Sequence, residues 1–139
     1  MAREATLVYE TALPVAYKVA DSGAIEKGTF LKQADARTAS ASTGTNDIVA
    51  GIAAQEKIAS DGKTALAVYT DGFFKVTASG TVAMGAALKT ATPGNYVMAV
   101  SDLSGANIVG YAEEAATEDQ TVLIRLNIQN NVGANAGGG

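Results

Sequence analysis

Three short patterns occur twice along this chain, in the same order and at nearly the same separation. The first is h-x-x-G-x-x-L-K, where h is β-branched, at residues 25–32 and 82–89. The second is Gly-apolar-Ala at residues 51–53 and 110–112. The third is an alternating run that begins with a threonine, Thr64-x-Leu66-x-Val68 and Thr121-x-Leu123-x-Arg125. Repetition at one period indicates two related structural units. Chance similarity in a chain rich in Gly and Ala is the alternative.

The repeated segments have the two-residue periodicity of β-strands. In residues 120–128, Val122, Ile124, Leu126 and Ile128 share one face, while Arg125 and Asn127 lie on the other. Further candidate strands cover residues 6–9, 15–19, 29–32, 48–53, 64–69, 73–77, 96–100 and 108–112. Asp71-Gly72 between two such runs predicts a hairpin with a type I′ turn. Short strands at this spacing predict a mostly β fold, a small β-barrel or sandwich-like domain built of two pseudo-repeated β units.

The ends of the chain differ from its middle. The 139 residues suffice for one domain, and we expect residues 25–128 to form it. Residues 1–24 are predicted to form an extended N-terminal arm and the first strands, with apolar side chains that have no place in the repeat: Leu7, Val8, Tyr9 and Leu13. Residues 129–139 contain almost nothing to bury and are predicted to be a flexible tail.

The composition excludes several classes of function. Without Cys or His, thiolate and imidazole metal sites are absent, as are nucleophile mechanisms that need a Cys or a His base. A net charge of −4 with scattered Lys and Arg argues against binding nucleic acid. No signal peptide and no apolar run approaching the roughly 20 residues of a membrane helix is visible, so we expect no membrane association and synthesis in the cytoplasm.

Two motifs resemble sites of chemistry, but each fits a plain structural role better. Residues 61–64 (Asp-Gly-Lys-Thr) end like a phosphate-binding P-loop, yet the first glycine of that motif would fall on Lys57. The carboxylate pair Glu113-Glu114 is adjacent in sequence, so its side chains point to opposite faces of a strand. We therefore expect no enzymatic activity, no cofactor, no metal and no small-molecule substrate.

The ordered set of motifs resembles the capsid cement (head decoration) proteins of tailed bacteriophages. The matching segments are 28–31, 48–53, 67–74, 85–88, 108–112 and 122–127, and they follow that family's order of G-x-x-h, hhGhA, V-x-x-x-G-h-F, a second hhGhA and a closing R-L-N. The resemblance spans roughly residues 25 to 128. No single motif is specific to this family, but the order and spacing of the whole set are more specific.

The resemblance implies a compact β-barrel-like domain that trimerises on the outer surface of the capsid. Such homotrimers stabilise contacts between major capsid protein subunits, so the partner would be the major capsid protein and the location the virion. On this interpretation we assign capsid binding to the arm residues Leu7, Val8, Tyr9 and Leu13. The trimer interface is assigned to Phe73, Phe74, Tyr69 and Arg125, because aromatic residues concentrate at interface hot spots.

A display or adhesion module is the alternative. A β domain on a virion or cell surface could bind glycans or host proteins through exposed loops such as residues 39–46.

Overall fold

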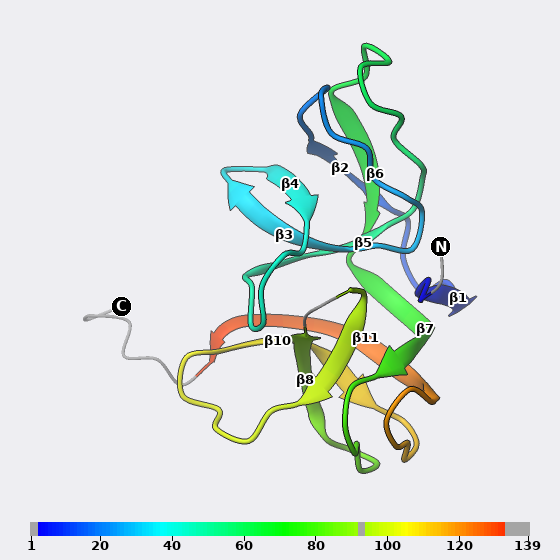
Figure 1. The fold of residues 1–139 in the computed structure, drawn as a ribbon, viewed down its shortest axis with the longest axis vertical. Helices are drawn as coiled ribbons and strands as arrows, with labels where there is room; N and C mark the ends of the chain where they lie inside the picture. Colours follow the sequence, from blue (N-terminus) through cyan, green and yellow to red (C-terminus); the bar gives the residue numbers. More distant parts are fainter. Residues whose placement is uncertain (1–2, 92–93, 133–139) are drawn as a thin grey trace.

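The computed structural model describes residues 3–91 and 94–132, and every regular element in these ranges is a β-strand (Figure 1). The strands are β1 (Thr6–Tyr9), β2 (Val15–Lys18), β3 (Phe30–Asp35), β4 (Thr38–Ala41), β5 (Val49–Ala53), β6 (Ala65–Tyr69), β7 (Asp71–Ala78), β8 (Ala87–Ala91), β9 (Tyr96–Ala99), β10 (Ala106–Ala112) and β11 (Thr121–Val132). The ranges described contain no helix that is long and apolar enough to cross a membrane.

Strands β2 to β6 close into a five-stranded barrel, which we call barrel 1. Its order is β2-β4-β3-β5-β6, and the ring closes through an antiparallel pairing of β6 with β2. The one parallel pairing joins β2 to β4, where Lys18 lies opposite Thr38. The interior is filled by small and medium apolar side chains, among them Leu31, Leu66 and Val68.

Strands β7 to β11 repeat this topology and form barrel 2. Their order is β7-β11-β10-β8-β9, and the parallel pairing of β9 with β7 closes the ring where Tyr96 lies opposite Thr77. Each pairing in barrel 1 has a counterpart of the same direction in barrel 2. The expected mostly β fold of two related units is confirmed, and Figure 1 shows barrel 1 above barrel 2.

The third repeated pattern is one residue out of register. Val68 lies opposite Ala53 in barrel 1, and Ile124 lies opposite Ala112 in barrel 2. Ala53 and Ala112 occupy equivalent places in the repeat. The counterpart of Val68 is therefore the buried Ile124 and not Arg125, which is exposed. A slip of one residue moves a strand's side chains to the opposite face, so burial decides the register.

The predicted hairpin at Asp71-Gly72 is wrong. β6 pairs with β2 and β5, whereas β7 pairs with β1, β9 and β11. Thr70 is the single residue between β6 and β7, and it links the two barrels. Gly72 has a φ of 129°, and a Cβ there would lie 3.1 Å from the carbonyl oxygen of Tyr9. This glycine therefore permits the close approach of β1 rather than a tight turn.

The two barrels share a hydrophobic core. One cluster of buried side chains combines Phe30, Val49 and Ile52 from barrel 1 with barrel 2 residues such as Phe74 and Leu88. In barrel 1 these side chains point outward from β3 and β5, away from that barrel's own interior. Their burial is the apolar part of the contact between the barrels.

Asparagine side chains complete this contact. Asn95, which is 6% exposed, accepts a hydrogen bond from the Phe30 N–H (2.8 Å) and donates one to the Gly28 carbonyl (2.7 Å). Asn130 binds both backbone groups of Val49, at 2.9 and 3.2 Å. These amides satisfy backbone donors and acceptors that would otherwise be buried without partners.

The terminal segments are partly integrated into the barrels. β1 adds a sixth strand beside β7, and β2 is a strand of barrel 1. Ala5 is 3% exposed, and its N–H donates to the carbonyl of Gly28. At the other end, β11 continues to Val132, while the rest of the predicted tail, residues 133–139, lies outside the described residues.

Candidate docking surface on barrel 2

A row of aromatic and arginine side chains crosses the outside of four adjacent strands. Phe73 on β7 lies opposite Tyr9 on β1 and Arg125 on β11, and Arg125 in turn lies opposite Tyr111 on β10. Directly paired residues of neighbouring strands project to the same face of a sheet. We call these four residues, Tyr9, Phe73, Arg125 and Tyr111, the aromatic row.

Contacts within the aromatic row hold its members together. The rings of Tyr9 and Phe73 meet edge to face with their centroids 5.9 Å apart. The Arg125 guanidinium carbon lies 5.3 Å from the centroid of Phe73, a cation–π contact. Edge-to-face aromatic pairs contribute roughly 0.5–1.5 kcal/mol beyond the burial of their area. Tyr9, Phe73 and Arg125 therefore contact one another, while the hydroxyl of Tyr111 donates to Gln129 Oε1 at 3.3 Å.

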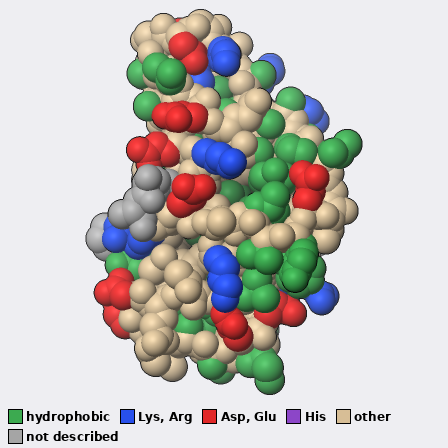
Figure 2. Space-filling model, turned by 90° about the vertical axis from the view of Figure 1, so that its right-hand side faces the viewer, with side chains coloured by type: hydrophobic (Ala, Val, Ile, Leu, Met, Phe, Trp, Pro, Cys, Tyr) green, Lys and Arg blue, Asp and Glu red, His purple; other side chains and the backbone are tan. Residues whose placement is uncertain are grey.

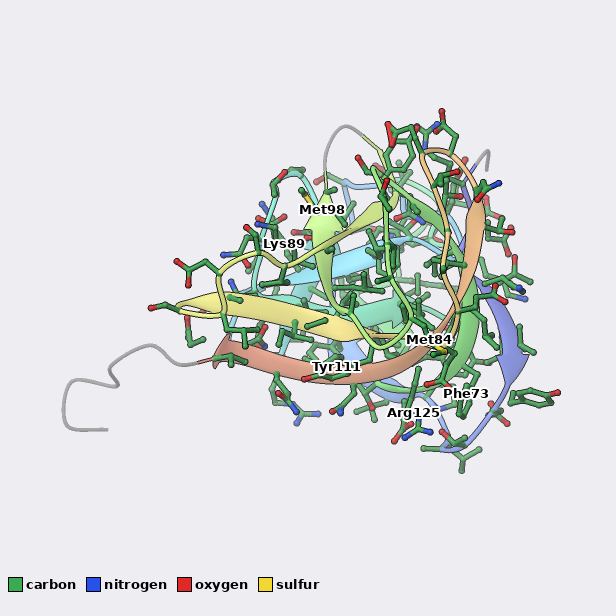
Figure 3. All side chains as sticks on the ribbon, turned by 90° about the horizontal axis from the view of Figure 1, so that it is seen from below. Phe73, Met84, Lys89, Met98, Tyr111 and Arg125 are labelled. Atoms are coloured by element: carbon green, nitrogen blue, oxygen red, sulfur yellow. The ribbon has the colours of Figure 1, made fainter. Side chains whose placement is uncertain are left out.

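The surroundings of the aromatic row add an apolar side chain and an ion pair. Met84 is 74% exposed, and the N–H of the next residue, Gly85, donates to the carbonyl of Ala112, which follows Tyr111. Figure 3 labels Met84 together with Tyr111, Phe73 and Arg125. The Lys75 ammonium donates to the Glu114 carboxylate at 2.7 Å. This bond, followed by one from the backbone N–H of Leu123, lowers the pKa of Glu114.

The four residues assigned to a trimer interface divide into two pairs. Phe73 and Arg125 lie on the outside, and the Arg125 side chain is 58% exposed. Phe74 is only 1% exposed and packs edge to face against Tyr69, with the ring centroids 5.5 Å apart. Phe74 faces the shared core because adjacent strand residues point in opposite directions. Its side chain is therefore not accessible to a neighbouring subunit.

The four residues assigned to the N-terminal arm are also placed differently from one another. Leu7 packs against the shared core, so it anchors β1. Val8, Tyr9 and Leu13 are 40%, 64% and 79% exposed. Tyr9 belongs to the aromatic row, so the structure brings the two sets of predicted interface residues together.

The arm also presents an unpaired strand edge. β1 is the terminal strand of its sheet, and within the described residues its outer edge pairs with no other strand. Figure 2 shows the side of the molecule on which β1 and β7 lie, where hydrophobic side chains gather near the middle among Lys, Arg, Asp and Glu residues. An unpaired edge of this kind accepts an added strand through main-chain hydrogen bonds.

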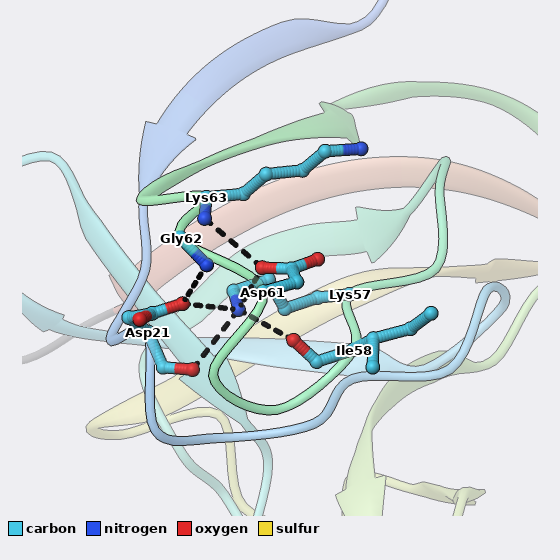
Figure 4. A network of polar contacts seen from close by, with 6 residues as sticks. All are labelled: Asp21, Lys57, Ile58, Asp61, Gly62 and Lys63. Carbon is cyan, nitrogen blue, oxygen red and sulfur yellow. Dashed lines mark hydrogen bonds and ion pairs between the residues drawn. The ribbon is translucent and has the colours of Figure 1, made fainter.

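A buried lysine organises the segment that resembled a P-loop (Figure 4). The Lys57 side chain is fully buried, and its ammonium donates to Asp61 Oδ1 at 2.7 Å and Asp21 Oδ1 at 3.0 Å. It also donates to the backbone carbonyls of Ile58 and Asp21, at 2.7 and 3.0 Å. Desolvation lowers the pKa of Lys57, but the hydrogen bonds that its ammonium donates to Asp61 and Asp21 outweigh this effect and raise the pKa overall. The amine is therefore held as an ammonium and is not a nucleophile.

The same segment is unsuited to phosphate. The N–H of Gly62 donates to the Asp21 carboxylate at 2.8 Å, and the N–H of Lys63 donates to Asp61 at 2.9 Å. Amides that would cradle a phosphate in a P-loop are thus engaged by carboxylates of the same charge sign as the ligand. In the described part of the chain no cluster of His, Cys, Asp or Glu side chains could hold a metal ion.

Sequence reasoning did not identify Tyr111 and Met84 as surface residues. The signal for Tyr111 was a difference inside the repeat, since Gly51-Ile52-Ala53 corresponds to Gly110-Tyr111-Ala112. Ile52 is fully buried because it faces barrel 2, whereas Tyr111 is half-exposed on the outside of barrel 2. The amphipathic Tyr111 thus stands where the other unit has the aliphatic Ile52, and this difference indicates a surface that is exposed in barrel 2 and covered in barrel 1.

Comparison with known proteins gives a likeness of fold. No family model matches the sequence, and no curated protein matches it. Among solved structures, the N base of the head fiber gp8.5 in bacteriophage phi29 superimposes with a TM-score of 0.54 and 21% sequence identity, covering 81% of this chain and 92% of that one. The chain thus shares its fold with a base module of a phage head fiber.

Proposed function

We propose that this chain is a non-enzymatic structural protein of a phage head, which decorates the outer surface and bridges major capsid protein subunits. The likeness of fold to the phi29 head fiber base carries the proposal, because it covers nearly all of that chain. The aromatic row and the open edge of β1 support it, since each offers a contact for another subunit.

The proposed capsid contact is the arm. Val8 and Leu13 are exposed apolar side chains at and just beyond β1, whose outer edge pairs with no strand of the described residues. A strand of the capsid protein added along β1 would gain main-chain hydrogen bonds, and these two side chains would supply apolar contact. Leu7 and Ala5 stay in the core, so the outer face of the arm can be changed without removing β1.

Co-sedimentation with heads that lack this protein tests the arm. We expect Val8→Asp with Leu13→Asp to reduce occupancy at least about ten-fold, because both substitutions place charge in an apolar contact. Ile58→Asp is the matched control, since Ile58 is 64% exposed and lies in barrel 1, outside the arm. Occupancy equal to that of the control would contradict the arm's role.

The proposed contact between copies is the aromatic row. Tyr and Arg are enriched among the residues that dominate binding energy at interfaces, and the row contains two Tyr, one Arg and one Phe. Homotrimers built through this surface would hold three arms at once, which raises the avidity for a capsid lattice by about 10² to 10⁴.

The solution mass tests this contact independently of capsid binding. We expect the wild-type protein to have three times the 14.0 kDa chain mass, and Arg125→Ala or Tyr111→Ala to have the chain mass alone. Ile58→Ala should remain trimeric. A wild-type monomer, or an Arg125→Ala trimer as stable as wild type, would refute the assignment while leaving the arm experiment open.

A further inference from the structure

A polar cleft lies where the end of barrel 1 meets β11 of barrel 2. Its volume is about 590 Å³, within the range of roughly 300–1,000 Å³ found for small-ligand sites. Barrel 1 contributes Tyr17, Gln33, Val49 and Ala50, the connection contributes Thr70 and Asp71, and β11 contributes residues 125–128 and Asn130. Of these lining residues, Arg125 belongs also to the aromatic row, and the others belong to neither the row nor β1.

The internal repeat shows that the opening is peculiar to barrel 1. By strand register, Tyr17 corresponds to Val76 and Gln33 to Thr90. In barrel 2, Val76 and Thr90 are 1% and 2% exposed, and Thr90 donates to the carbonyl of Gly44 in a loop of barrel 1. Tyr17 is half-exposed and Gln33 is exposed. The equivalent end of barrel 2 is therefore closed, with a loop of barrel 1 contacting Thr90, whereas this end of barrel 1 is open.

Several polar groups along the cleft are available to a ligand. Within the described residues, the Tyr17 hydroxyl and the side-chain amides of Gln33 and Asn127 have no hydrogen-bond partner, although many other amide side chains of the chain do. Each amide offers both donors and an acceptor. Leu126 and Ile128 supply apolar surface beside them.

The charges at the cleft oppose an anionic ligand. Arg125 and Asp71 contribute one positive and one negative side chain. The Arg125 guanidinium already lies 3.9 Å (Nε to Oε2) from the Glu113 carboxylate, and Asp71 adds a second negative charge at the cleft. A phosphate or carboxylate would thus meet no uncompensated positive charge.

The walls also disfavour an extended peptide. Strand addition requires free backbone donors and acceptors, but the N–H and C=O of Val49 at the cleft are both bound by Asn130. What remains free is a set of side-chain amides and a phenol next to apolar surface. That combination suits a ligand with neutral hydroxyl groups around a C–H face.

From these features we infer that the cleft binds a neutral saccharide. Tyr17 packs against the sugar ring, and the amides of Gln33 and Asn127 bind its hydroxyl groups. The cleft shares Arg125 with the aromatic row, but the two amides that the inference assigns to the sugar, Gln33 and Asn127, belong to neither the row nor β1, so their substitution tests the inference separately from the proposed role on a phage head.

Saturation-transfer NMR and calorimetry with the full chain test this inference. The probes are cellotriose, maltotriose and triacetylchitotriose as neutral saccharides, 3′-sialyllactose as an anionic one, and a hexapeptide of Ser, Thr, Gly and Asn. We expect binding of at least one neutral trisaccharide, weakened about three- to ten-fold by Gln33→Ala and by Asn127→Ala, which is the effect of losing one hydrogen bond.

Gln129→Ala is the matched control, because Gln129 is an exposed amide of β11 that does not line the cleft. Gln33 and Asn127 are exposed without partners in the described structure, so their replacement should leave the unfolding temperature unchanged. The inference is overturned if no neutral trisaccharide binds, if only the peptide or the anionic saccharide binds, or if Gln129→Ala weakens binding as much as the cleft substitutions.

Discussion

At the residue scale, Lys57 bears more polar contacts than any other side chain described above. Its ammonium makes four hydrogen bonds, two to carboxylates and two to backbone carbonyls, and they tie residue 21 to residues 57–61. In barrel 2 the corresponding bridge is made by Ala116, which pairs with Val82 as Lys57 pairs with Ile25. The lysine is therefore an addition to barrel 1 and not a requirement of the fold.

Replacing this lysine should destabilise the protein. Lys57→Met keeps the aliphatic stem but leaves Asp21, Asp61 and two carbonyls without their donor, so we expect the thermal unfolding midpoint to fall by about 5 °C or more. Lys63→Met is the control, because Lys63 contacts Asp61 through its backbone N–H, which the substitution keeps. Differential scanning calorimetry measures both, and equal midpoints for the two variants would contradict the prediction.

The same network predicts a dependence of stability on pH. The hydrogen bond from Lys57, followed by the one from the Lys63 N–H, lowers the pKa of Asp61 from 3.8 to about 2. A carboxyl group with a lowered pKa stabilises the folded state above its unfolded pKa, and this contribution is lost as the pH falls from 3.8 toward 2. The raised pKa of Lys57 acts in the opposite sense, with stability present below 10.5 and lost as the pH rises beyond it.

Urea unfolding between pH 7 and pH 2 measures this effect. Asp61→Asn should flatten the loss of stability below pH 4, because the titrating group is gone. In a Lys57→Met background the same substitution should change the pH dependence much less, since the donor that lowers the pKa of Asp61 is absent. An Asp61→Asn profile parallel to wild type down to pH 2 would show that the group contributes nothing to acid unfolding.

At the scale of strands, Gly51 and Gly110 permit the close approach of two backbones at equivalent places in the two barrels. A Cβ at Gly51 would collide with the carbonyl oxygen of Tyr69, and one at Gly110 would collide with that of Arg125. We expect Gly110→Ala to lower the free energy of unfolding by about 1–3 kcal/mol, because backbone atoms must move. Gly23→Ala is the control, since its Cβ would meet nothing within 4 Å. Chemical denaturation compares them, and a Gly110→Ala protein as stable as the Gly23→Ala control would argue against this close approach.

The sequence predicted most strands, but it missed β8 and took residues 39–46, which include most of β4, for an exposed loop. The connections were predicted poorly. Alternation located β11 and the core side chains Val122 and Ile124, because burial on one face imposes period two. Asp71-Gly72 has the composition of a tight turn, yet the glycine is required by the backbone of Tyr9, a contact between distant segments. The aromatic row and the cleft combine residues that are far apart in sequence. They could not be predicted, because the sequence does not reveal which strands pair or in which register.

At the scale of the whole molecule, the barrels should unfold as one unit. Barrel 2 is covered by Phe30, Val49 and Ile52, which point out of barrel 1, so unfolding of either barrel would expose apolar side chains of this shared cluster. The asparagine contacts lie in this junction and add polar bonds to the shared apolar surface. Coupling between two units rises with the interface they share, and a large apolar interface makes them cooperative.

Asn95→Ala tests this coupling. The substitution leaves the buried N–H of Phe30 without its acceptor, which should cost about 1–3 kcal/mol. Asn127→Ala is the exposed control, with an expected change within about 0.5 kcal/mol. Native-state hydrogen exchange then reports each barrel separately, through the amides of Leu66 in β6 and Ile124 in β11. If the barrels form one cooperative unit, Asn95→Ala lowers protection by the same free energy at both amides. Protection that falls in one barrel alone would show that the barrels unfold independently, despite the core that they share.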